Sequence, residues 1–509
     1  MLAVIYGTSA CCFADVKLPT LFSDHMVLQR DMPLPVWGWA DPGEAVAVVL
    51  GEQTHETTAD AEGNWRVTLK PLSLGEPQTM VVEGKNRLQV NDILVGEVWL
   101  CSGQSNMGWE VRNCWSADLD IAAAKFPNIR MITVGGIGSQ TPVKDFDGQW
   151  DVCTPETVGS FSAVGYFFGR ELHQVLDVPI GLIDNAWGGS SCEAWIRRDL
   201  LEGNPMYEAL LARWKKTEDE YDLEEKKAEL AEKIKAWEIS VADAKETGKR
   251  PPAKPRLRNP LINQHRPANL YNARLMPIHP FAMRGTIWYQ GESNAGRAYQ
   301  YREMFPLMIQ NWRDAWKQGD FPFYWVQLAD FTEETSEPGD SNWAELREAQ
   351  TMTMDRLANT GEAVIIDLGE ASDIHPRNKI DVARRLARWA LARDYGLDFV
   401  YHSPRYDSME VVDGKVVLSF KDVGKRLRTV DAREVQGFAI AGADKKWVWA
   451  NAKIIDNQHI EVSCEAVTEP VAVRYGWANN PVCNVHNDLG LPLTPFRTDD
   501  WPGVTAEAR

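Results

Sequence analysis

The middle of this chain contains six short apolar runs, and each is followed by a segment with helical spacing or by a loop that leads to one. The runs cover residues 93–100, 129–134, 180–183, 286–289, 323–328 and 364–366. Runs that are buried on both faces and separated by helices form parallel strands with crossover connections. The pattern therefore predicts a doubly wound α/β domain over residues 92–400.

The two ends of the chain have a different pattern, in which alternating apolar residues are separated by turns such as Asp-Pro-Gly and Glu-Gly-Asn. This alternation predicts a small β-sandwich module over residues 18–91 and a second β module over residues 401–509. A chain of 509 residues exceeds what one hydrophobic core usually serves, so several domains are expected.

A highly charged segment, residues 206–246, interrupts the α/β pattern and is followed by the stiff stretch "KRPPAKPRLRNP". Its Glu and Lys residues recur at a spacing of four, which is typical of a solvated helix. We expect a charged helical insertion at about 206–260, formed as a hairpin or as one long helix, and favour a solvated insertion over an arm that binds a partner.

The composition excludes several classes of partner. The formal net charge of −18 repels phosphate backbones and anionic lipid, so neither nucleic acid nor a membrane surface is expected as a partner. The sequence also has no stretch near the ~20 apolar residues that a membrane span needs. Residues 1–17 resemble the end of a signal peptide, with small residues near Ala10 and Ala14, which predicts an exported, periplasmic or extracellular protein.

The cysteines do not have the spacing of a metal site. Two of the eight lie at positions 11 and 12, and the other six could form disulfides if the chain is exported. None of the spacings is C-x-x-C, so a zinc site is not expected. The sequence also contains 21 Trp residues, most of which we expect in the cores, although indole faces suit sugar rings.

Four loops that follow the apolar runs contain polar side chains. They are "CSGQSNMG" (101–108), "DNAWGGSSCEAW" (184–195), "YQGESNAG" (289–296) and "DLGEASDIHPRNK" (367–379). Ligands of open parallel sheets bind beyond the carboxyl ends of the strands, which is where these loops are expected. Together they supply a serine, a glycine pair, an amide, and a histidine with carboxylates, the components of a serine acyl-transfer site.

Two of these components occur twice. Ser105 and Ser293 both lie in the pattern G-x-S-N-x-G, so both remain candidate nucleophiles at this point. The pattern differs from the G-x-S-x-G of α/β-hydrolases, which argues against that family. His279 and His375 both precede a proline, but only His375 is followed by a clear helix pattern, with Pro376 expected in its first turn. The orienting acid is expected to be Asp373, with two carboxylates behind it as further candidates, Asp367 and Glu370.

These residues resemble the SGNH-hydrolase superfamily, and within it the sialate O-acetylesterase family of carbohydrate acetylesterases. The matching stretches are "CSGQSNM", "PIGLIDNAWGGSSCEAW", "WYQGESN", "WAELREAQ" and "DIHPRNK", with "HMVLQRDMPLPVWGWADPGE" and "GLPLTPFRTD" at the two ends. The resemblance spans nearly the whole chain. It implies a flavodoxin-like doubly wound parallel sheet flanked by small β-sandwich modules.

The resemblance also assigns roles. It implies that Ser105 is the nucleophile and contributes its own N–H to the oxyanion hole, with Gly189 as the next donor, Gly188 as the alternative, and the Gln290 amide as the third. His375 matches the general base. The superfamily usually has an Asp three residues before this His, where this chain has Ser372. The acid is therefore assigned to Asp373, two residues before His375, which departs from the usual spacing. The implied mechanism needs no metal or organic cofactor.

The substrate implied first is an O-acetylated sialic acid, and acetylated xylan or pectic sugars are the alternatives. The residues proposed to contact a sugar lie beside the predicted site, at Trp187, Glu193 and Glu292. A rival of another class is a non-catalytic glycan-binding protein. A glycoside hydrolase that uses Glu292 and Asp373 as its carboxylate pair is a third and weaker hypothesis.

Overall fold

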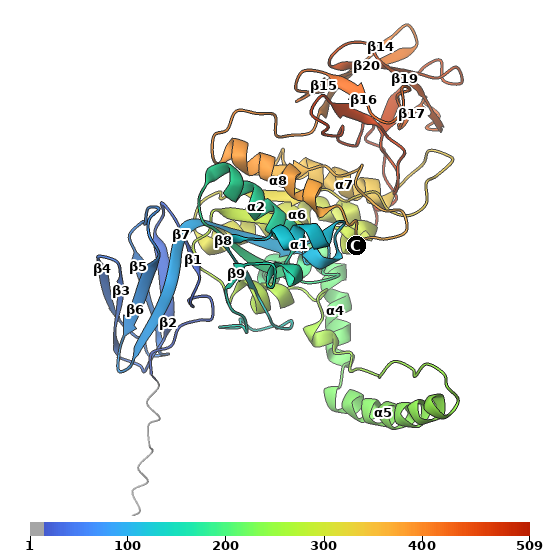
Figure 1. Cartoon of the computed structure of the whole chain (residues 1–509). Coiled ribbons are helices and arrows are strands. Elements are labelled where there is room, and N and C mark those ends of the chain that lie inside the picture. The colour runs from blue at the N-terminus through green and yellow to red at the C-terminus, as the bar shows by residue number, and fades with distance from the viewer. Residues whose placement is uncertain (1–14) are drawn as a thin grey trace, which may run out of the picture.

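The structure is a computed structural model that describes residues 15–509, so most of the expected signal segment lies outside the described residues. Figure 1 shows a β module at the N-terminal end, a central α/β domain, and a second β module at the C-terminal end. A pair of charged helices leaves the central domain on one side.

The N-terminal module consists of short, mainly antiparallel strands arranged in two sheets. Strand β2 pairs with β5, whereas β3 pairs with both β4 and β6. Side chains on one face of each sheet are buried, which matches the alternating sequence pattern. The bounds are Val27–Gln29 (β1), Leu34–Trp39 (β2), Ala45–Leu50 (β3), Gln53–Thr58 (β4), Asn64–Leu69 (β5) and Gln78–Glu83 (β6).

Strand β7 (Arg87–Gly103) joins this module to the central domain. Its first part pairs with β6 antiparallel, and its last part lies between two parallel strands of the central sheet. The side chains alternate between buried and exposed up to Asp92, and every residue from Ile93 to Gly103 is buried. The expected boundary at residues 91–92 therefore falls inside one continuous strand.

The central sheet has the strand order β9-β8-β10-β7-β11-β12-β13. All neighbours are parallel except β8 and β9, which are antiparallel at one edge. The bounds are Phe126–Thr133 (β8), Asp151–Cys153 (β9), Ile180–Ala186 (β10), Gly285–Tyr289 (β11), Phe323–Val326 (β12) and Thr360–Ala363 (β13).

Helices cover both faces of this sheet. Helices α2 (Ala163–Leu176) and α8 (Lys379–Arg393) pack together on one face, and α6 (Ala298–Trp316) packs with α7 (Asn342–Thr353) on the other. Strand β11 shows the division, since Ile287 and Tyr289 belong to the core under α2 and α8, whereas Trp288 belongs to the core under α6. Alternate side chains of a strand point to opposite faces, and helices cover both faces of this sheet. Successive residues are therefore buried, which explains the near-continuous apolar runs.

The strand order differs from the flavodoxin-like order 2-1-3-4-5, in which β8 would lie directly beside β7. Here β10 separates the two. The burial of the two strands agrees with this order: six of the seven residues of β10 are buried, as a central strand requires, whereas β8 has exposed residues at Pro127, Asn128 and Thr133. The strand with the more continuous apolar run takes the inner position.

The last strand of the sheet begins earlier than the sequence pattern predicts. We expected residues 364–366 to form it, whereas β13 ends at Ala363. Within residues 15–509 its neighbour in the sheet is β12, which ends at Val326, so the buried apolar residues that follow Ala363 extend past the end of the strand they would pair with.

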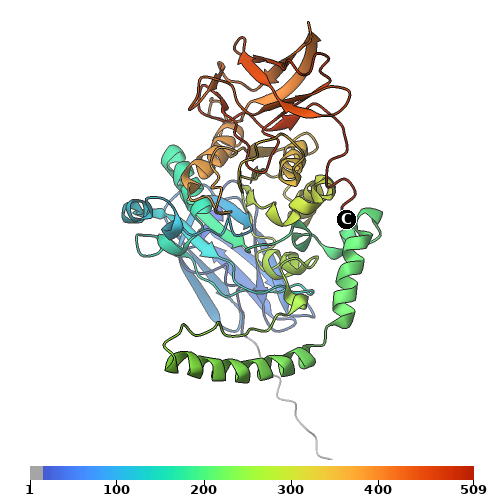
Figure 2. The same ribbon diagram turned by 90° about the vertical axis from the view of Figure 1, so that its right-hand side faces the viewer.

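The charged insertion forms two helices rather than one, α4 (Glu208–Glu220) and α5 (Leu223–Glu246). Figure 2 shows α4 running along the side of the central domain, and α5 lying crosswise to α4 below that domain. The side chains of α5 form ion pairs mainly with one another, for example Lys227 with Glu224 and Lys235 with Glu232. The remaining α-helices of the described chain are the short α1 (Ala117–Ala123) and α3 (Arg198–Leu201).

The C-terminal module has two four-stranded antiparallel sheets, with the orders β14-β15-β20-β19 and β18-β17-β21-β23, and a small β16-β22 pair. Its core is separate from those of the central domain. The bounds are Arg405–Val412 (β14), Lys415–Lys421 (β15), Leu427–Thr429 (β16), Phe438–Ala441 (β17), Trp447–Trp449 (β18), Asn451–Ile454 (β19), His459–Ser463 (β20), Ala472–Tyr475 (β21), Val485–Asn487 (β22) and Phe496–Arg497 (β23).

Within residues 15–509 all six cysteines are free thiols. In the same part of the chain, no helix is long and apolar enough to cross a membrane, and no group of three or more metal-ligating side chains is close enough to hold an ion.

Candidate active site

Three parallel strands deliver their following loops to one edge of the central sheet. The loop after β7 begins with Gln104, whose backbone N–H donates to the Tyr289 carbonyl at the end of β11 (2.9 Å). The loop after β10 begins with Trp187, whose N–H donates to the Gly103 carbonyl at the end of β7 (3.0 Å). These backbone bonds hold the three loops in register where the strands end.

The fourth loop, which follows β13, brings His375 to Ser105. The Nε2 atom of His375 lies 2.8 Å from the Ser105 hydroxyl oxygen, although the two residues are 270 positions apart in the sequence. Asp373 lies on the other side of the imidazole, with its Oδ1 atom 3.4 Å from Nδ1 and accepting the His375 backbone N–H at 2.9 Å. The three side chains form a relay from a carboxylate through an imidazole to a hydroxyl.

The environment of His375 favours its neutral form. Burial lowers the pKa of His375, the nearby Lys379 cation lowers it further, and Asp373 opposes both effects. Trp109 lies flat against the imidazole, with ring centroids 5.0 Å apart and an interplanar angle of 14°. We did not predict a role for Trp109 from the sequence, and its position four residues after Ser105 gave no signal for one.

Helix α8 starts later than the sequence pattern predicts. We expected Pro376 in its first turn, but the helix begins at Lys379, and the Asn378 side chain caps it by accepting the Asp381 N–H. His375 is therefore held by the loop and its contacts rather than by the helix N-terminus.

The Gly188-Gly189 turn lies against the nucleophile loop. A methyl group placed on Gly188 would lie 3.6 Å from Cβ of Ser105, and Gly189 has φ +67°, a conformation that favours glycine. Among residues 15–509, no acceptor takes the backbone N–H of Ser105, Gly188 or Gly189. These donors remain available for an oxygen bound next to Ser105.

Ser293, the second candidate nucleophile, supports the glycine turn. The Ser293 hydroxyl donates to the Gly189 carbonyl at 2.8 Å and so braces the glycine turn. The second histidine is remote from Ser105: His279 contacts the Ala315 carbonyl (2.8 Å) and packs edge-on against Trp316.

The expected oxyanion donor Gln290 is turned away from the site. Its side chain is fully buried, and its NH₂ group donates to the Ser190 carbonyl (3.0 Å) and to Asn294 Oδ1 (2.7 Å). Because both hydrogens of the amide are used, this side chain has none left for an oxyanion. The expectation from the sequence is corrected: the amide is held by Ser190 of the loop after β10 and by Asn294 of its own loop.

Two of the expected sugar contacts are also engaged elsewhere. Glu193 is buried and pairs with Arg297 (2.6 Å) and Asn294 (2.9 Å). Glu292 accepts hydrogen bonds from the side-chain amides of Gln104 and Asn106, the two residues on either side of Ser105. Glu193 is thus fully buried and paired away from a sugar, whereas Glu292 is partly exposed, braces the segment that carries Ser105 and stays a predicted sugar contact. Trp187 is half-buried, with Arg274 stacked on its indole (4.7 Å).

A buried cation completes the polar network behind the nucleophile. Lys379 is fully buried and donates to Asn106 Oδ1 at 2.6 Å, with the Tyr289 ring 5.0 Å from its ammonium group. Burial lowers the pKa of Lys379 to about 7, and the partly buried Glu292 is among the acidic groups that oppose the shift. The network of Lys379, Asn106 and Glu292 ties the loops after β11 and β13 to the segment that carries Ser105.

The other candidate acids have different partners. Asp367 forms two hydrogen bonds with Arg385 (2.6 and 2.7 Å) and lies 3.2 Å from His486 of the C-terminal module. Glu370 pairs with Arg377 (3.0 Å). Asp373 is therefore the carboxylate among the three that faces the His375 imidazole.

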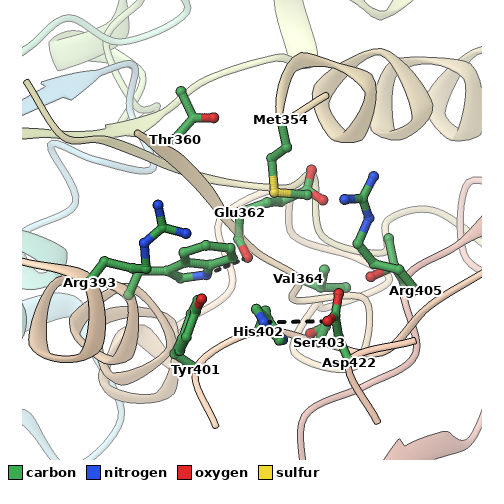
Figure 3. Close-up of a pocket in the computed structure, with 12 residues that line it drawn as sticks. Met354, Thr360, Glu362, Val364, Arg393, Tyr401, His402, Ser403, Arg405 and Asp422 are labelled. Atoms are coloured by element: carbon green, nitrogen blue, oxygen red, sulfur yellow. Dashed lines mark hydrogen bonds and ion pairs between the residues drawn. The ribbon is translucent and has the colours of Figure 1, made fainter. Parts of the chain in front are cut away.

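The pocket drawn in Figure 3 lies elsewhere, between the edge strand β13, the end of α8 and the C-terminal module. Its volume is about 210 Å³, and its lining includes Glu362, Arg393, His402 and Arg405 but none of the predicted site residues. Burial raises the pKa of Glu362 to about 7, and its carboxylate accepts hydrogen bonds from the Trp325 indole and the Thr351 hydroxyl.

The chemistry of the Ser105 region is that of covalent catalysis by an oxygen nucleophile. A hydroxyl lies within hydrogen-bond reach of an imidazole, the imidazole faces a carboxylate, and the glycine turn with its unused N–H groups lies against the serine. This arrangement can transfer an acyl group through a Ser ester.

Comparisons with known proteins point to the same chemistry. The model of the carbohydrate esterases described as sialic acid-specific acetylesterases matches residues 95–230 and 262–390. Sialate O-acetylesterases from mouse and human are each 29% identical to the chain, and the alignments cover 97% and 96% of the chain and 96% and 94% of those proteins. A crystal structure of a carbohydrate acetylesterase from Xanthomonas citri is similar to 96% of this chain and 100% of its own, with a TM-score of 0.79 and 39% identity.

Proposed function

The chain belongs to the sialic acid-specific acetylesterase family of carbohydrate esterases, and on that basis we propose that it removes acetyl groups from sugar hydroxyls through a Ser105 acyl-enzyme. The membership itself makes the protein a hydrolase of carboxylic esters. The single observation that carries the assignment of the nucleophile is the 2.8 Å contact between Ser105 and His375.

In the proposed first step, His375 Nε2 accepts the Ser105 proton while Oγ attacks the acetyl carbonyl carbon. The carbonyl oxygen becomes an oxyanion, which the N–H groups of Ser105 and Gly189 stabilise, with Gly188 as the alternative donor. Each such donor can lower the barrier by ~3 kcal/mol, because it is oriented before the charge develops. The C–O bond to the sugar then breaks, and His375 returns the proton to the leaving sugar oxygen.

In the second step, His375 removes a proton from water, and the water oxygen attacks the acetyl carbon of the Ser105 ester. Collapse of the intermediate releases acetate and regenerates the Ser105 hydroxyl with the proton held by His375. Asp373 is proposed to hold the imidazole tautomer that presents Nε2 to Ser105. The residues assigned to these steps supply a nucleophile, a base and oxyanion donors, so no step requires a metal.

The substrate proposed first is an O-acetylated sialic acid, with the 9-O-acetyl ester as the leading candidate. The names of the mammalian relatives and of the matching family support a sialic acid ester as the substrate. Acetylated xylan and pectic sugars are the alternatives. The fold proposed for the central domain is the doubly wound SGNH-hydrolase fold, in a variant whose β10 lies between β7 and β8. We also propose that the protein is exported, because residues 1–17 resemble the end of a signal peptide.

The experiment is acetate release from O-acetylated sialic acid, acetylated xylan and acetylated pectin by the wild type and by serine variants. We expect Ser105→Ala to lower kcat about 10³-fold or more on the preferred substrate. Ser293→Ala should cost at most about 10-fold, because its hydroxyl supports Gly189 without reacting. The exposed Ser160→Ala is the matched control and should retain full activity.

Equal rates for the wild type and Ser105→Ala would refute the assigned nucleophile. Tight glycan binding by a wild type that releases no acetate from any ester would instead favour the non-catalytic glycan-binding hypothesis.

A further inference from the structure

The loop between β12 and α7 lies between the C-terminal module and the loop that carries His375. On one side, the buried Asn480 of the C-terminal module donates its side-chain amide N–H to the Thr332 carbonyl (2.7 Å). On the other side, the Thr332 N–H donates to the Ala371 carbonyl of the His375 loop (3.1 Å). The backbone of a single residue, Thr332, thus connects the C-terminal module to the catalytic loop.

Thr332 has a backbone conformation that its side chain disfavours. Its φ is +77°, in the left-handed region that β-branched residues rarely adopt. Such a conformation persists only where the surrounding structure over-determines it, and here hydrogen bonds on both sides of Thr332 hold it. Outliers of this kind cluster at functional sites, where the position of the chain matters more than its local stability.

A second set of contacts runs beside the first. The Gly369 N–H donates to the Asp330 Oδ1 atom (2.7 Å), and the Phe331 N–H donates to the Asn479 carbonyl of the C-terminal module (3.1 Å). A Cβ atom on Gly369 would lie 2.0 Å from the Asp330 carbonyl oxygen, so the two loops are in direct contact there. Residues 330–332, the bridging segment, are therefore hydrogen-bonded on both sides.

The far side of the bridging segment leads to the proposed orienting acid. Ala371 lies two residues before Asp373, and the Asp373 N–H donates to the Glu370 carbonyl (3.1 Å) in a tight turn. The Asp373 carboxylate then faces the His375 imidazole. The Asp373 side chain is 45% exposed, so its position depends on the backbone of this turn rather than on a packed core.

The two ends of the turn are held by different groups. The Asn106 amide donates to the Ile374 carbonyl (3.0 Å), which ties the end next to His375 to the nucleophile loop. The other end, before Asp373, is bonded through Ala371 to the bridging segment. Loss of the bridging contacts should therefore displace Asp373 and leave the Ser105 loop in place.

We propose that Thr332 and Asn480 are positioning residues, which hold the turn that places Asp373 against His375. The inference rests on the proposed function. It adds that the C-terminal module acts on the reaction through the bridging segment.

The expected signature is a change in the pKa of His375 together with a loss of kcat. Within residues 15–509 two charged groups alter this pKa: Lys379 of α8 lowers it, and Asp373 raises it. Displacement of Asp373 removes the second effect and keeps the first, so the acidic midpoint of kcat/KM should move downward by about half a unit. The imidazole is also oriented less well, so kcat should fall about 10-fold.

The test uses the full chain, with 4-nitrophenyl acetate as the ester. Asn480→Leu removes the amide that bonds to Thr332, and Thr332→Pro removes the N–H that bonds to Ala371 and forbids a positive φ. Both should lower kcat about 10-fold, keep KM within about twofold and move the acidic midpoint downward. Thr332→Gly is the rescue variant: it keeps both backbone bonds and adopts the same φ freely, so its kcat should exceed that of Thr332→Pro about fivefold or more.

Asn484→Leu is the matched control for damage to the C-terminal module. Asn484 is a buried amide of the same module, and its side chain bonds to Glu434 and Gln436 within that module. This variant should lower the thermal midpoint but keep kcat within about twofold and the wild-type pH midpoint.

The proposal is overturned if Asn480→Leu and Thr332→Pro keep the wild-type kcat and pH midpoint. It is overturned equally if Asn484→Leu moves the pH midpoint as far as they do. A Thr332→Gly protein as slow as Thr332→Pro also overturns it, since the backbone bonds would then not account for the loss.

A fluorophosphonate probe separates this proposal from the proposed function. The Ser105 oxygen displaces fluoride from phosphorus while His375 takes the proton, so the labelling rate reports how well the imidazole is placed. Labelling that is fast in the wild type and about 10-fold slower in Asn480→Leu supports the positioning role. A wild type that is not labelled at Ser105 and hydrolyses no acetyl ester refutes the proposed function and the positioning role with it.

Discussion

At the scale of single residues, the pair of Ser105 and His375 depends on neighbours that do not react. Trp109 covers one face of the imidazole, and Asp373 faces its Nδ1 atom. Lys379 acts from behind the nucleophile: it hydrogen-bonds Asn106, the residue after Ser105, and its charge disfavours a proton on His375. A base held neutral in this way can accept the Ser105 proton at lower pH than an ordinary imidazole.

The first prediction concerns the pH dependence set by Lys379. The pKa of His375 lies below its ordinary value of 6.5, and activity requires the neutral imidazole, so the acidic limb of kcat/KM should have its midpoint below pH 6.5. Lys379, with a pKa of about 7, is protonated in that range and repels an imidazolium. Lys379→Met removes this repulsion, so the midpoint should move upward by about half a unit or more.

The measurement is the pH profile of kcat/KM for 4-nitrophenyl acetate. Arg384→Met, which removes an exposed cation from the same helix, serves as the control and should keep the wild-type midpoint. An unchanged midpoint in Lys379→Met would contradict the electrostatic role, whatever its effect on kcat.

At the scale of elements, the site exists because strands of one parallel sheet end at a common edge and their loops bond to one another. The backbones approach most closely at the end of β7, where the chain enters the loop that carries Ser105. Gly103 has φ +135°, and a Cβ atom there would lie 2.2 Å from the Tyr289 carbonyl oxygen of β11. No side chain fits between the two strands at this position, so the loop can turn toward His375 only with glycine.

The second prediction follows from this close approach. Gly103→Ala must either push β11 away or rotate the loop, so we expect a loss of ~2–4 kcal/mol in unfolding free energy together with most of the esterase activity. Gly296→Ala is the matched control, because Gly296 is exposed in the loop after β11 and a Cβ there meets open space. Thermal unfolding and acetate release measure both effects. A Gly103→Ala protein as stable and active as Gly296→Ala would contradict the argument.

At the scale of the whole molecule, single structural elements connect the three parts of the chain. Strand β7 belongs to both the N-terminal module and the central sheet. On the other side, Arg347 of α7 is fully buried and donates to four carbonyls: those of Leu328 and Ala329 after β12, and those of Ala478 and Asn479 in the C-terminal module. The C-terminal module is thus joined to the loop that follows a strand of the central sheet.

The third prediction tests this connection. Arg347→Met leaves the Leu328 and Ala478 carbonyls without a donor in a buried interface, and each unsatisfied group costs ~1–3 kcal/mol. The other two carbonyls keep a second donor, the Trp343 indole N–H at Ala329 and the Phe331 N–H at Asn479. We expect the thermal midpoint to fall by ~5 °C or more, with the C-terminal module unfolding before the rest in calorimetry. Arg356→Met removes an arginine whose pair with Glu303 is exposed, and it should change the midpoint by no more than ~2 °C. Equal midpoints for the two variants would refute the role of Arg347.

Much of the fold and part of the site could be predicted from the sequence. Five of the six apolar runs marked central strands, and the residues that follow the runs pointed to Ser105 and His375, because strand burial and helix spacing are properties of neighbours along the chain. The resemblance to the acetylesterases was confirmed by the comparisons for the same reason, since motifs such as "CSGQSNM" and "DIHPRNK" are local.

The remaining features depend on partners that are distant in the sequence. The amide of Gln290 bonds to Ser190, Glu193 is neutralised by Arg297, and β10 lies between β7 and β8. No local pattern encodes these choices, because each polar group bonds to whatever the packed core brings near it. The sequence by itself determined which segments carry the chemistry. Only the tertiary structure decided which side chains remain free to perform it, since burial and hydrogen bonding occupy the others.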